Sequence, residues 1–319
     1  MKNSLICYSV GALLYTPANN CKIADDIASG CFGEKYSVAL CLEDTIRDNC
    51  VAQAETILVD SLKKLYELRK TEDFYLPKLF VRVRYSKQMQ TIYHDLGSAA
   101  GILTGFIIPK ISLSNIDAYL NSFLSVRRQS DHQLYMMPIL ESEELIDPVT
   151  RVEVLSEIRD KLATLRKDVL NIRVGGNDLC NAFGMRRHND ETIYDIRPIA
   201  DILTDIIAVF GRDYVISGPV WEYYSGNGWD EGMKREIRMD IRAGFIGKTV
   251  IHPNQIRVVN DALMVTENDY CDAKAILGWD SENLVAGSAD RSRMNEYKTH
   301  YRWAEKIMYL AKYYGVKNE

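Results

Sequence analysis

The feature that most constrains this chain is a regular alternation of short apolar runs with longer amphipathic segments. Eight runs are rich in Val, Ile, Leu and aromatic residues, and several are apolar on both faces, as strands of a helix-covered parallel sheet are. They are LLYT (13–16), VALCLE (38–43), KLFVRVR (78–84), GFIIPK (105–110), LYMMPILE (134–141), VLNIRVGG (169–176), DYVISG (213–218) and KTVIH (248–252). The pattern predicts an α/β protein with a mainly parallel sheet.

The segments between these runs have apolar residues three and four positions apart, the spacing of a helix with one buried face. Residues 51–70 carry such a stripe, and residues 193–211 and 231–244 both end in a Gly that suits a helix C-terminus. From residue 16 to residue 252 the seven steps average about 34 residues, the size of a βα unit. The spacing predicts a (β/α)₈ TIM barrel. A doubly wound open sheet is the alternative, which the lack of a Gly-rich first turn disfavours.

The strand signal stops after residue 252. Further helices are expected in HPNQIRVVNDALMV, in 267–279 and in 299–316, with a polar loop over 281–297. A tail of about 50 residues cannot build a core of its own. We therefore expect a TIM-barrel catalytic domain over 1–262 and a C-terminal helical extension over 263–319, acting as a lid or an oligomerisation arm.

Composition and charge exclude several classes of protein. With 47% hydrophobic and 26% charged residues the chain is not disordered. A net charge of −5 and a pI near 5.7 argue against a nucleic-acid partner. No run of apolar residues is long enough to span a membrane. The N-terminal MKNSLICYSVGALLY lacks a cleavage site and is expected to lead straight into a strand, so it is not interpreted as a signal peptide.

The cysteines and histidines carry no recognisable motif. The seven cysteines are odd in number and form no C-x-x-C pair, which favours reduced thiols in a cytoplasmic protein over a disulfide framework or a structural zinc site. The five histidines form no H-x-H or H-E-x-x-H pair, and neither a P-loop nor a G-x-G-x-x-G fingerprint is present.

Charged or small residues close nearly every apolar run. In barrels of this kind the working residues lie at the carboxyl ends of the strands, so these positions are expected to converge on one mouth. They are Glu43 and Asp44, Arg82 and Arg84, Lys110, Glu141, Gly175 to Asp178, Gly218 and His252.

Glu141 and Asp178 end neighbouring strands, with no Cys or His close to them in sequence. Two hard oxygen ligands suit Mg²⁺, which keeps several waters for a substrate to replace. The alternative is structural: Asp178 precedes a helix-like segment that it could cap, and Glu141 precedes a polar loop. Spacing alone leaves both interpretations open.

Arg82 and Arg84 alternate with valines, which predicts that both point to one face of the third strand. Glu43 and Asp44 on the neighbouring strand are expected partners. The set is either a structural ion-pair network or an arginine whose free N–H groups bind a substrate oxygen.

Two other strand ends are less specific. Gly175 and Gly176 allow close approach of a ligand to the backbone, or simply a tight strand-to-helix turn. His252, which precedes a Pro, is interpreted as structural rather than as a catalytic base.

Taken together, the motifs resemble the family of citrate lyase β-subunits and malyl-CoA lyases, which are aldolase-type barrels. The series here reads LLYTPANN, ALCLEDTI, LFVRVRY, GFIIPKI, MMPILE, GGNDL and GKTVIHPNQI. The family signatures read roughly LFVPGNR, LDLEDAV, VRVN, GIVLPKV, ALIET, GAEDF and GKLAIHPAQI. The order and spacing are kept across the strands, and the likeness extends into residues 293–307. The chain looks like a divergent branch of carbon–carbon bond lyases with the TIM-barrel fold.

The resemblance implies a Mg²⁺-dependent carbon–carbon lyase. Glu141 and Asp178 match the family's two metal carboxylates, and Arg82 matches the arginine that contacts substrate near the metal. Glu43 and Asp44 match the acidic pair that holds Mg²⁺-bound water and orients that arginine.

A lid, an oligomer and a substrate class are implied as well. Glu296 matches the family's lid aspartate, which in several members reaches into the next subunit's site. Members form trimers or hexamers and cleave a 3-hydroxy-acid thioester into a 2-oxo acid and an acyl-CoA, or run the reverse condensation. The expected partner is therefore a small 2-oxo or hydroxy acid, with or without CoA. Substrate contacts are expected at Asn19, Arg84, Lys110, Gly175 and Gly176.

The chain departs from the family at positions that concern CoA. The family's Gly-Asn-Arg after the first strand reads Ala18-Asn19-Asn20, so an arginine linked to CoA phosphate binding is missing. Arg84 replaces the Asn of V-R-V-N, and Asn177 replaces an acidic residue. These changes predict that the metal and enolate chemistry is retained and that the binding site for CoA is altered. They also predict a substrate that is more anionic near the metal, or a free acid instead of a thioester. Two alternatives remain: a thioester hydrolase on the same scaffold, and a non-catalytic binding barrel.

Overall fold

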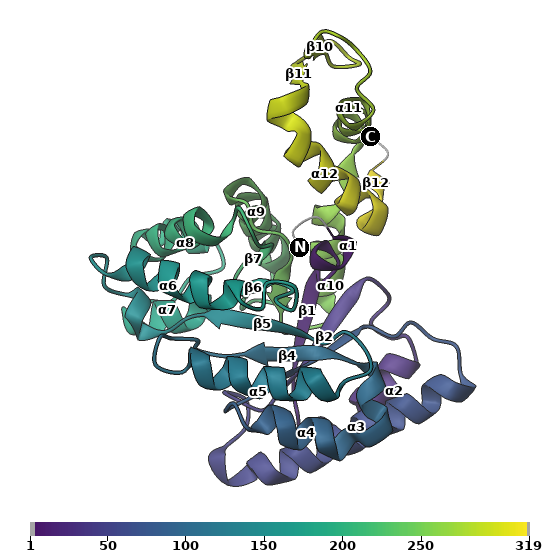
Figure 1. The fold of residues 1–319 in the computed structure, drawn as a ribbon, viewed down its shortest axis with the longest axis vertical. Coiled ribbons are helices and arrows are strands. Elements are labelled where there is room, and N and C mark those ends of the chain that lie inside the picture. Colours follow the sequence, from purple (N-terminus) through teal and green to yellow (C-terminus); the bar gives the residue numbers. More distant parts are fainter. Residues whose placement is uncertain (1–3, 318–319) are drawn as a thin grey trace.

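Eight parallel strands form the centre of the protein, whose computed structural model describes residues 4–317 (Figure 1). The strands follow the order β7-β6-β5-β4-β3-β2-β1-β8, and a parallel bridge between Gly218 and Lys248 joins the two ends of this order. The prediction of a (β/α)₈ barrel is confirmed, and the open-sheet alternative is wrong. The strands are β1 (Ala12–Pro17), β2 (Tyr36–Cys41), β3 (Lys78–Arg82), β4 (Leu103–Ile108), β5 (Tyr135–Leu140), β6 (Ile172–Val174), β7 (Ile216–Ser217) and β8 (Lys248–Val250).

Helices alternate with the strands and cover the outside of the barrel (Figure 1). They are α2 (Ile23–Ala28), α3 (Val51–Thr71), α4 (Gln88–Leu96), α5 (Ile116–Gln129), α6 (Arg151–Ala163), α7 (Gly176–Ala182), α8 (Arg197–Phe210), α9 (Trp229–Ala243) and α10 (Asn254–Leu263). Short 3₁₀ turns are η1 (Asp48–Cys50), η2 (Gly97–Ile102), η3 (Glu143–Leu145) and η4 (Ile193–Asp195).

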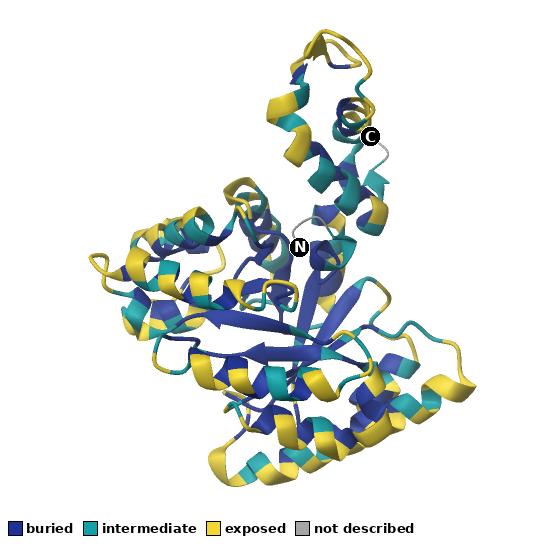
Figure 2. Cartoon of the chain, viewed as in Figure 1, coloured by how far each residue is buried: buried dark blue, intermediate teal, exposed yellow. Residues whose placement is uncertain are grey.

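The core lies between the strands and the inner faces of these helices. All six residues of β2 are buried, as a strand covered on both faces requires. On α3 the stripe of Leu58, Leu62 and Leu65 is buried, while the outer helix faces are exposed (Figure 2). Gly244 ends α9 with φ of 106°, the left-handed conformation that favours glycine at this position.

The N-terminal segment does not run straight into the first strand, as the sequence had suggested. A short helix, α1 (Leu5–Tyr8), precedes β1. Its Tyr8 carbonyl accepts a hydrogen bond of 2.9 Å from the Tyr314 hydroxyl. The apolar run LICY thus forms a helix that packs against the C-terminal helix α12, and it does not extend the first strand.

The C-terminal extension projects from one side of the barrel (Figure 1). It comprises β9 (Val265–Thr266), α11 (Glu267–Leu277), β10 (Val285–Gly287), β11 (Met294–Glu296), α12 (Tyr297–Tyr314) and β12 (Val316–Lys317). β12 pairs with β9, and α12 contacts α1 and α10, so the base of the extension is attached to the barrel. The segment 281–297 was expected to be a loop, but its ends pair as the antiparallel hairpin β10–β11. The boundary predicted at 262/263 lies in the last turn of α10 and stays a prediction.

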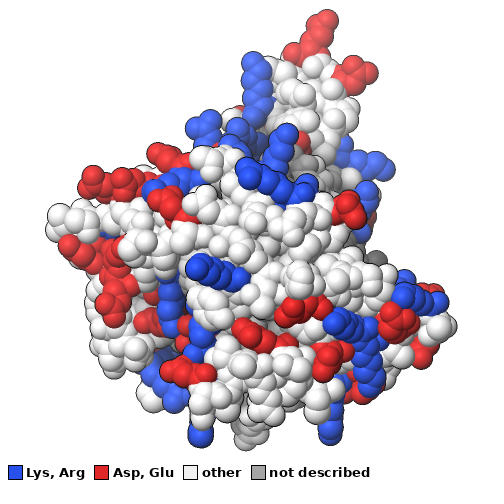
Figure 3. All heavy atoms as spheres, turned by 60° about the horizontal axis from the view of Figure 1, so that its bottom comes forward, with Lys and Arg blue, Asp and Glu red and all other residues white. Residues whose placement is uncertain are grey.

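Two further features concern the helices and the surface charge. Within residues 4–317 no helix is both long and apolar enough to cross a membrane. On the face seen in Figure 3, Lys and Arg are interspersed with Asp and Glu, and the described residues form no broad basic stripe there.

Candidate active site

Six charged residues from five consecutive strand ends meet at the carboxyl-terminal mouth of the barrel. We call this set the mouth cluster. It consists of Glu43 and Asp44 after β2, Arg82 at the end of β3, Lys110 after β4, Glu141 after β5, and Asp178 in the first turn of α7. The convergence that the strand ends predicted is present in the structure.

Arg82 lies at the centre of the mouth cluster and is buried. Its Nη2 is 2.6 Å from Glu43 Oε2, 3.1 Å from Asp44 Oδ2 and 3.2 Å from Glu141 Oε1. Burial lowers the pKa of the guanidinium, but Tyr15 and these carboxylates outweigh that effect and raise it. Arg82 Nε is buried and has no hydrogen-bond partner in residues 4–317. A fully charged donor is therefore held with an N–H group to spare.

Lys110 joins the two sides of the mouth cluster. Its Nζ is 2.8 Å from Glu43 Oε1, 2.9 Å from Asp44 Oδ1 and 3.7 Å from Asp178 Oδ1. Its backbone N–H donates to Glu141 Oε1 at 3.0 Å. Burial alone would raise the pKa of Asp44, but hydrogen bonds with Glu43 and Lys110 lower it to about 2.

Glu141 is the most buried carboxylate of the mouth cluster, with 2% of its side chain exposed. Burial and the nearby Asp178 raise its pKa to about 7, against the opposing effect of Arg82. Asp178 is more open, at 35%. Two carboxylates that disfavour each other's charge are stabilised by a divalent cation.

These two side chains fit a Mg²⁺ ion. Mg²⁺ in proteins is commonly bound by one or two carboxylates, with water and substrate oxygens completing the octahedron. Within residues 4–317 no group of three or more His, Cys, Asp or Glu side chains is placed to hold a metal. Glu141 and Asp178 would supply two carboxylate ligands.

The glycines after β6 make room for this arrangement. A Cβ on Gly175 would lie 1.8 Å from Glu141 Oε2, and a Cβ on Gly176 would lie 2.7 Å from Pro219 Cβ. A side chain at either position would collide with its neighbours, so the need for glycine comes from packing. Both glycines also line the mouth cavity, but the N–H and C=O of Gly175 are already hydrogen-bonded to Leu140 and Leu179.

The mouth cavity has a volume of about 440 Å³. Arg82, Glu141 and Asp178 line it together with residues that the sequence reasoning missed. These are Tyr15, Ile139, Arg173, Val174, Arg186, Val220, Glu222, Thr249 and Ile251. Arg173 is the most unusual of them, because it interrupts the apolar run VLNIRVGG. A single charged residue inside an otherwise apolar strand sequence could have identified Arg173 as a candidate site residue.

Arg84 lies away from the cavity, contrary to the expected common face with Arg82. Because β3 ends at Arg82, the alternation no longer applies at position 84. Its Nε donates to the Leu42 carbonyl at 3.1 Å and its Nη2 to the Glu43 carbonyl at 2.8 Å, while Nη1 pairs with Asp48. Arg84 therefore anchors the loop that carries Glu43, and the geometry does not favour a substrate contact.

Glu43 and Lys110 belong to the mouth cluster but do not line the cavity, and three further predicted residues lie outside both. Asn19 is exposed in the turn after β1. Glu296 lies on the C-terminal extension, where its Oε2 accepts a hydrogen bond of 2.6 Å from Thr299 Oγ1. His252 stacks on Tyr224 with 4.7 Å between ring centroids. Within one subunit, the structure does not bring Glu296 to the mouth.

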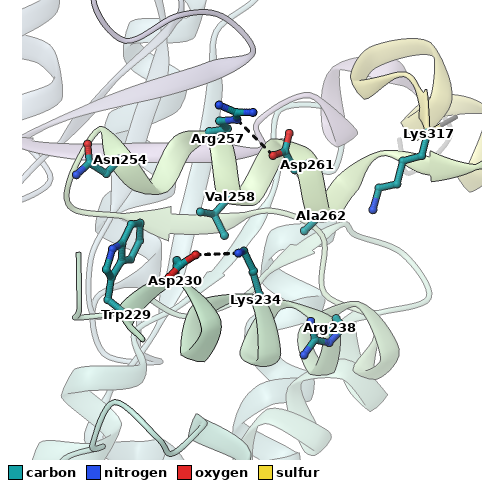
Figure 4. A pocket seen from close by; sticks show the side chains of 10 residues that line it. All are labelled: Trp229, Asp230, Lys234, Arg238, Asn254, Arg257, Val258, Asp261, Ala262 and Lys317. Atoms are coloured by element: carbon teal, nitrogen blue, oxygen red, sulfur yellow. Dashed lines mark hydrogen bonds and ion pairs between the residues drawn. The ribbon is translucent and has the colours of Figure 1, made fainter. Parts of the chain in front are cut away.

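A second hollow, of about 530 Å³, lies between α9 and α10 on the outside of the barrel (Figure 4). Its charges are largely paired with each other: Lys234 Nζ is 2.8 Å from Asp230, and Arg257 Nε is 3.6 Å from Asp261. The mouth, with its excess of carboxylates and its spare donors, is the better candidate for chemistry.

Comparison with known families decides the relationship. The family described as C–C bond lyase of the TIM-barrel fold matches residues 4–316. The chain belongs to this family. The resemblance inferred from the strand-end motifs is thereby confirmed.

Solved structures of related lyases share the fold of this family member. A citrate lyase from Burkholderia xenovorans LB400 is 13% identical, covers 97% of this chain and 94% of its own, and has a TM-score of 0.71. CitE from Mycobacterium tuberculosis, in complex with magnesium, acetoacetate and coenzyme A, is 17% identical, with coverages of 96% and 99% and a TM-score of 0.61.

A third structure is the citrate lyase β-subunit from M. tuberculosis with oxaloacetate and magnesium. It is 18% identical, covers 81% of this chain and 99% of its own, and has a TM-score of 0.54. Among curated protein sequences none matches the chain. At these identities the structures establish the fold.

Proposed function

We propose that this protein is a Mg²⁺-dependent carbon–carbon lyase that cleaves or forms a bond next to a 2-oxo or hydroxy acid. One observation carries the proposal: Glu141 and Asp178 lie together at the mouth, and Arg82 is 3.2 Å from Glu141. Membership of the C–C bond lyase family and neighbours solved with magnesium and oxaloacetate or acetoacetate support it.

Cleavage next to such an acid leaves an enolate, and a bound Mg²⁺ supplies a Lewis acid that draws its charge. Glu141 and Asp178 would hold the ion. Arg82 would stabilise the negative charge on the oxygen of the other fragment. Glu43 and Asp44 hold the guanidinium in position before the reaction starts, so no reorganisation is needed. Lys110 contacts both Glu43 and Asp44 and lowers the pKa of each carboxyl group, although burial still raises the pKa of Glu43 overall.

We propose that Glu296 serves as an acid–base group when the C-terminal extension closes over the mouth of a neighbouring subunit. Exposed apolar side chains support such a contact. Leu284, Val285 and Met294 are 43–54% exposed on the hairpin, and Tyr224 and Ile251 are 41–43% exposed on the barrel. Exposed apolar groups of this kind suit an interface between copies of the chain, as in a homotrimer or homohexamer. A cytoplasmic location is part of the proposal, and the seven cysteines, all of which lie within residues 4–317 and none of which is in a disulfide, support it.

The proposal is tested by following products. The protein is incubated with Mg²⁺ and a panel of 2-oxo acids, each with and without an acyl-CoA, and both the loss of the oxo acid and the formation of a hydroxy-acid product are measured. Magnesium-dependent formation of a new carbon–carbon bond, or release of a 2-oxo acid in the reverse direction, is expected. Release of free CoA without any 2-oxo acid chemistry would identify a thioester hydrolase instead, and binding without turnover would identify a non-catalytic barrel.

A further inference from the structure

Arg173 on β6 is a buried charge without a carboxylate partner. Only 1% of the residue is exposed. Its Nη2 donates to Thr249 Oγ1 at 2.6 Å, while Nε and Nη1 have no hydrogen-bond partner within residues 4–317. Tyr15 lies beside it, but a phenol carries no charge to balance the guanidinium. An arginine remains charged in such a place, so this arrangement is unfavourable in the absence of a ligand.

The other buried arginines show how this chain normally balances such a charge. Arg187 pairs with both oxygens of Glu236, at 2.7 and 2.9 Å. Arg82 contacts carboxylates of the mouth cluster, and Arg151 is 2.9 Å from Asp205. Arg173 alone among the buried arginines of residues 4–317 lacks such a partner. The missing anion has to come from outside the chain.

Arg173 lines the same cavity as Glu141 and Asp178. Its backbone pairs with Ile139, two residues before Glu141, and two residues of strand span about 6.6 Å. The guanidinium therefore belongs to a deeper layer of the barrel than the metal carboxylates. A small molecule bound to the metal at one end has its other end directed at this layer.

We propose that Arg173 binds a second carboxylate of the substrate, so that the enzyme acts on a dicarboxylate rather than on a monocarboxylic 2-oxo acid. The inference rests on the proposed function, because it assumes that the first carboxylate is bound at the metal. Nη2 has a second N–H besides the one given to Thr249, and together with Nε or with Nη1 it forms a parallel pair of N–H groups that matches a carboxylate. The sequence had suggested a more anionic substrate from Arg84; Arg84 is bound to backbone carbonyls, and Arg173 is the residue that can meet this need.

The test uses two pairs of probes that differ in a single group. Oxaloacetate is compared with 4-methyl-2-oxopentanoate, and 2-oxoglutarate with 5-methyl-2-oxohexanoate, because an isopropyl group replaces the distal carboxylate at nearly the same size. Binding is measured by calorimetric titration at saturating Mg²⁺. In the wild-type protein we expect at least one diacid to bind about tenfold or more tightly than its isostere.

The variants are Arg173→Met, Arg173→Gln and the control Arg159→Met. Arg159 lies on the outer helix α6, where it pairs with Asp160, and it does not line the cavity. Both Arg173 variants should lose the preference for the diacid and keep the affinity for the isostere. The control should keep the preference.

The outcomes separate this inference from the proposed function. Wild-type protein that binds 2-oxo acids with Mg²⁺ but does not prefer diacids, or Arg173 variants that keep the preference, would overturn the inference alone. If no 2-oxo acid binds in the presence of Mg²⁺, the proposed function fails and the inference fails with it. Thermal unfolding completes the test: Arg173→Met should melt no lower than the wild type, because it removes an unbalanced charge. Arg187→Met, which breaks the pair with Glu236, is measured for comparison. If Arg173→Met lowers the melting temperature as much as Arg187→Met does, Arg173 has a structural role and the inference is overturned.

Discussion

The barrel contains two clusters of buried charge that are built in opposite ways. The α9 network consists of Arg187, Tyr194, Glu236, Asp240 and Lys248. Lys248 Nζ is 2.8 Å from Glu236 and 2.7 Å from Asp240, and the Tyr194 hydroxyl is 2.7 Å from Asp240. Glu236 and Lys248 are 0% exposed, and two cations face two anions. Every charge in it is balanced and sealed from solvent.

The mouth cluster is neither balanced nor sealed. Its four carboxylates face two cations, and Asp44 and Asp178 are 48% and 35% exposed. Like-charge repulsion adds to burial in raising the pKa of Glu141 to about 7. Complete pairing therefore distinguishes charges that stabilise the fold from charges available to a ligand, since perturbed and incompletely paired groups gather at functional sites.

The largest effect is expected from breaking the α9 network. Glu236→Ala leaves Arg187 and Lys248 without a shared partner inside the protein, which costs about 3–5 kcal/mol of unfolding free energy. Urea denaturation measures it. Asp178→Asn, in the mouth cluster, should cost less than about 1 kcal/mol, since the carboxylate is partly exposed. Equal losses in both variants would remove the distinction between the two clusters.

The next effect concerns catalysis. Arg82→Lys should lower the rate of the lyase reaction by about 10²-fold or more, because a point charge cannot contact Glu43, Glu141 and a substrate oxyanion together. The unfolding free energy should change little by comparison. Steady-state kinetics on the substrate found in the product screen decides it, and a wild-type rate would show that Arg82 only holds the strand ends together.

A glycine substitution sharpens the account of the metal pair. Gly175→Ala places a methyl group 1.8 Å from the present position of Glu141 Oε2, so the carboxylate has to move. We expect Mg²⁺ affinity to fall by about tenfold, in the range seen when a residue that positions a metal ligand is changed. The control is Gly101→Ala, where the added Cβ meets no atom within 4 Å. Equal affinities in the two variants would contradict the packing argument.

The smallest effect is expected at the C-terminal extension. Glu296→Ala should reduce activity by about tenfold, because a positioned proton donor is lost but the metal pair is not. Glu296→Ala subunits, which should keep about a tenth of the activity, and inactive Glu141→Gln subunits are then mixed under conditions that permit exchange. If the extension serves a neighbour, the mixture should be more active than the Glu296→Ala subunits alone. If no mixture is more active, the extension serves its own barrel and the assignment between subunits is wrong.

The barrel could be predicted because its signal is repeated: eight apolar runs and their helices share one spacing, so an error at one run does not change the fold. The mouth cluster could be located because parallel strands place their carboxyl ends together. What the sequence could not supply was the side-chain direction beyond a strand's last residue. Arg84 follows Arg82 by two positions, yet β3 ends between them and Arg84 turns to backbone carbonyls.

The ion-pair partners of buried charges could not be predicted from the sequence either. Nothing near Lys248 in sequence shows that its ammonium meets Glu236 and Asp240 on the preceding helix, or that Arg173 has no carboxylate at all. The hairpin β10–β11 was missed because three-residue strands in a polar segment carry no apolar alternation.

The most direct test of the account is a calorimetric titration of Mg²⁺ into the wild-type protein, Glu141→Gln, Asp178→Asn and Glu143→Gln. Glu143 is a matched control, since it is an exposed carboxylate two residues from Glu141. We expect Mg²⁺ binding to be lost in Glu141→Gln and Asp178→Asn and kept in Glu143→Gln, with all of them folded. Unchanged Mg²⁺ affinity in both Glu141→Gln and Asp178→Asn would show that these two carboxylates do not bind the metal.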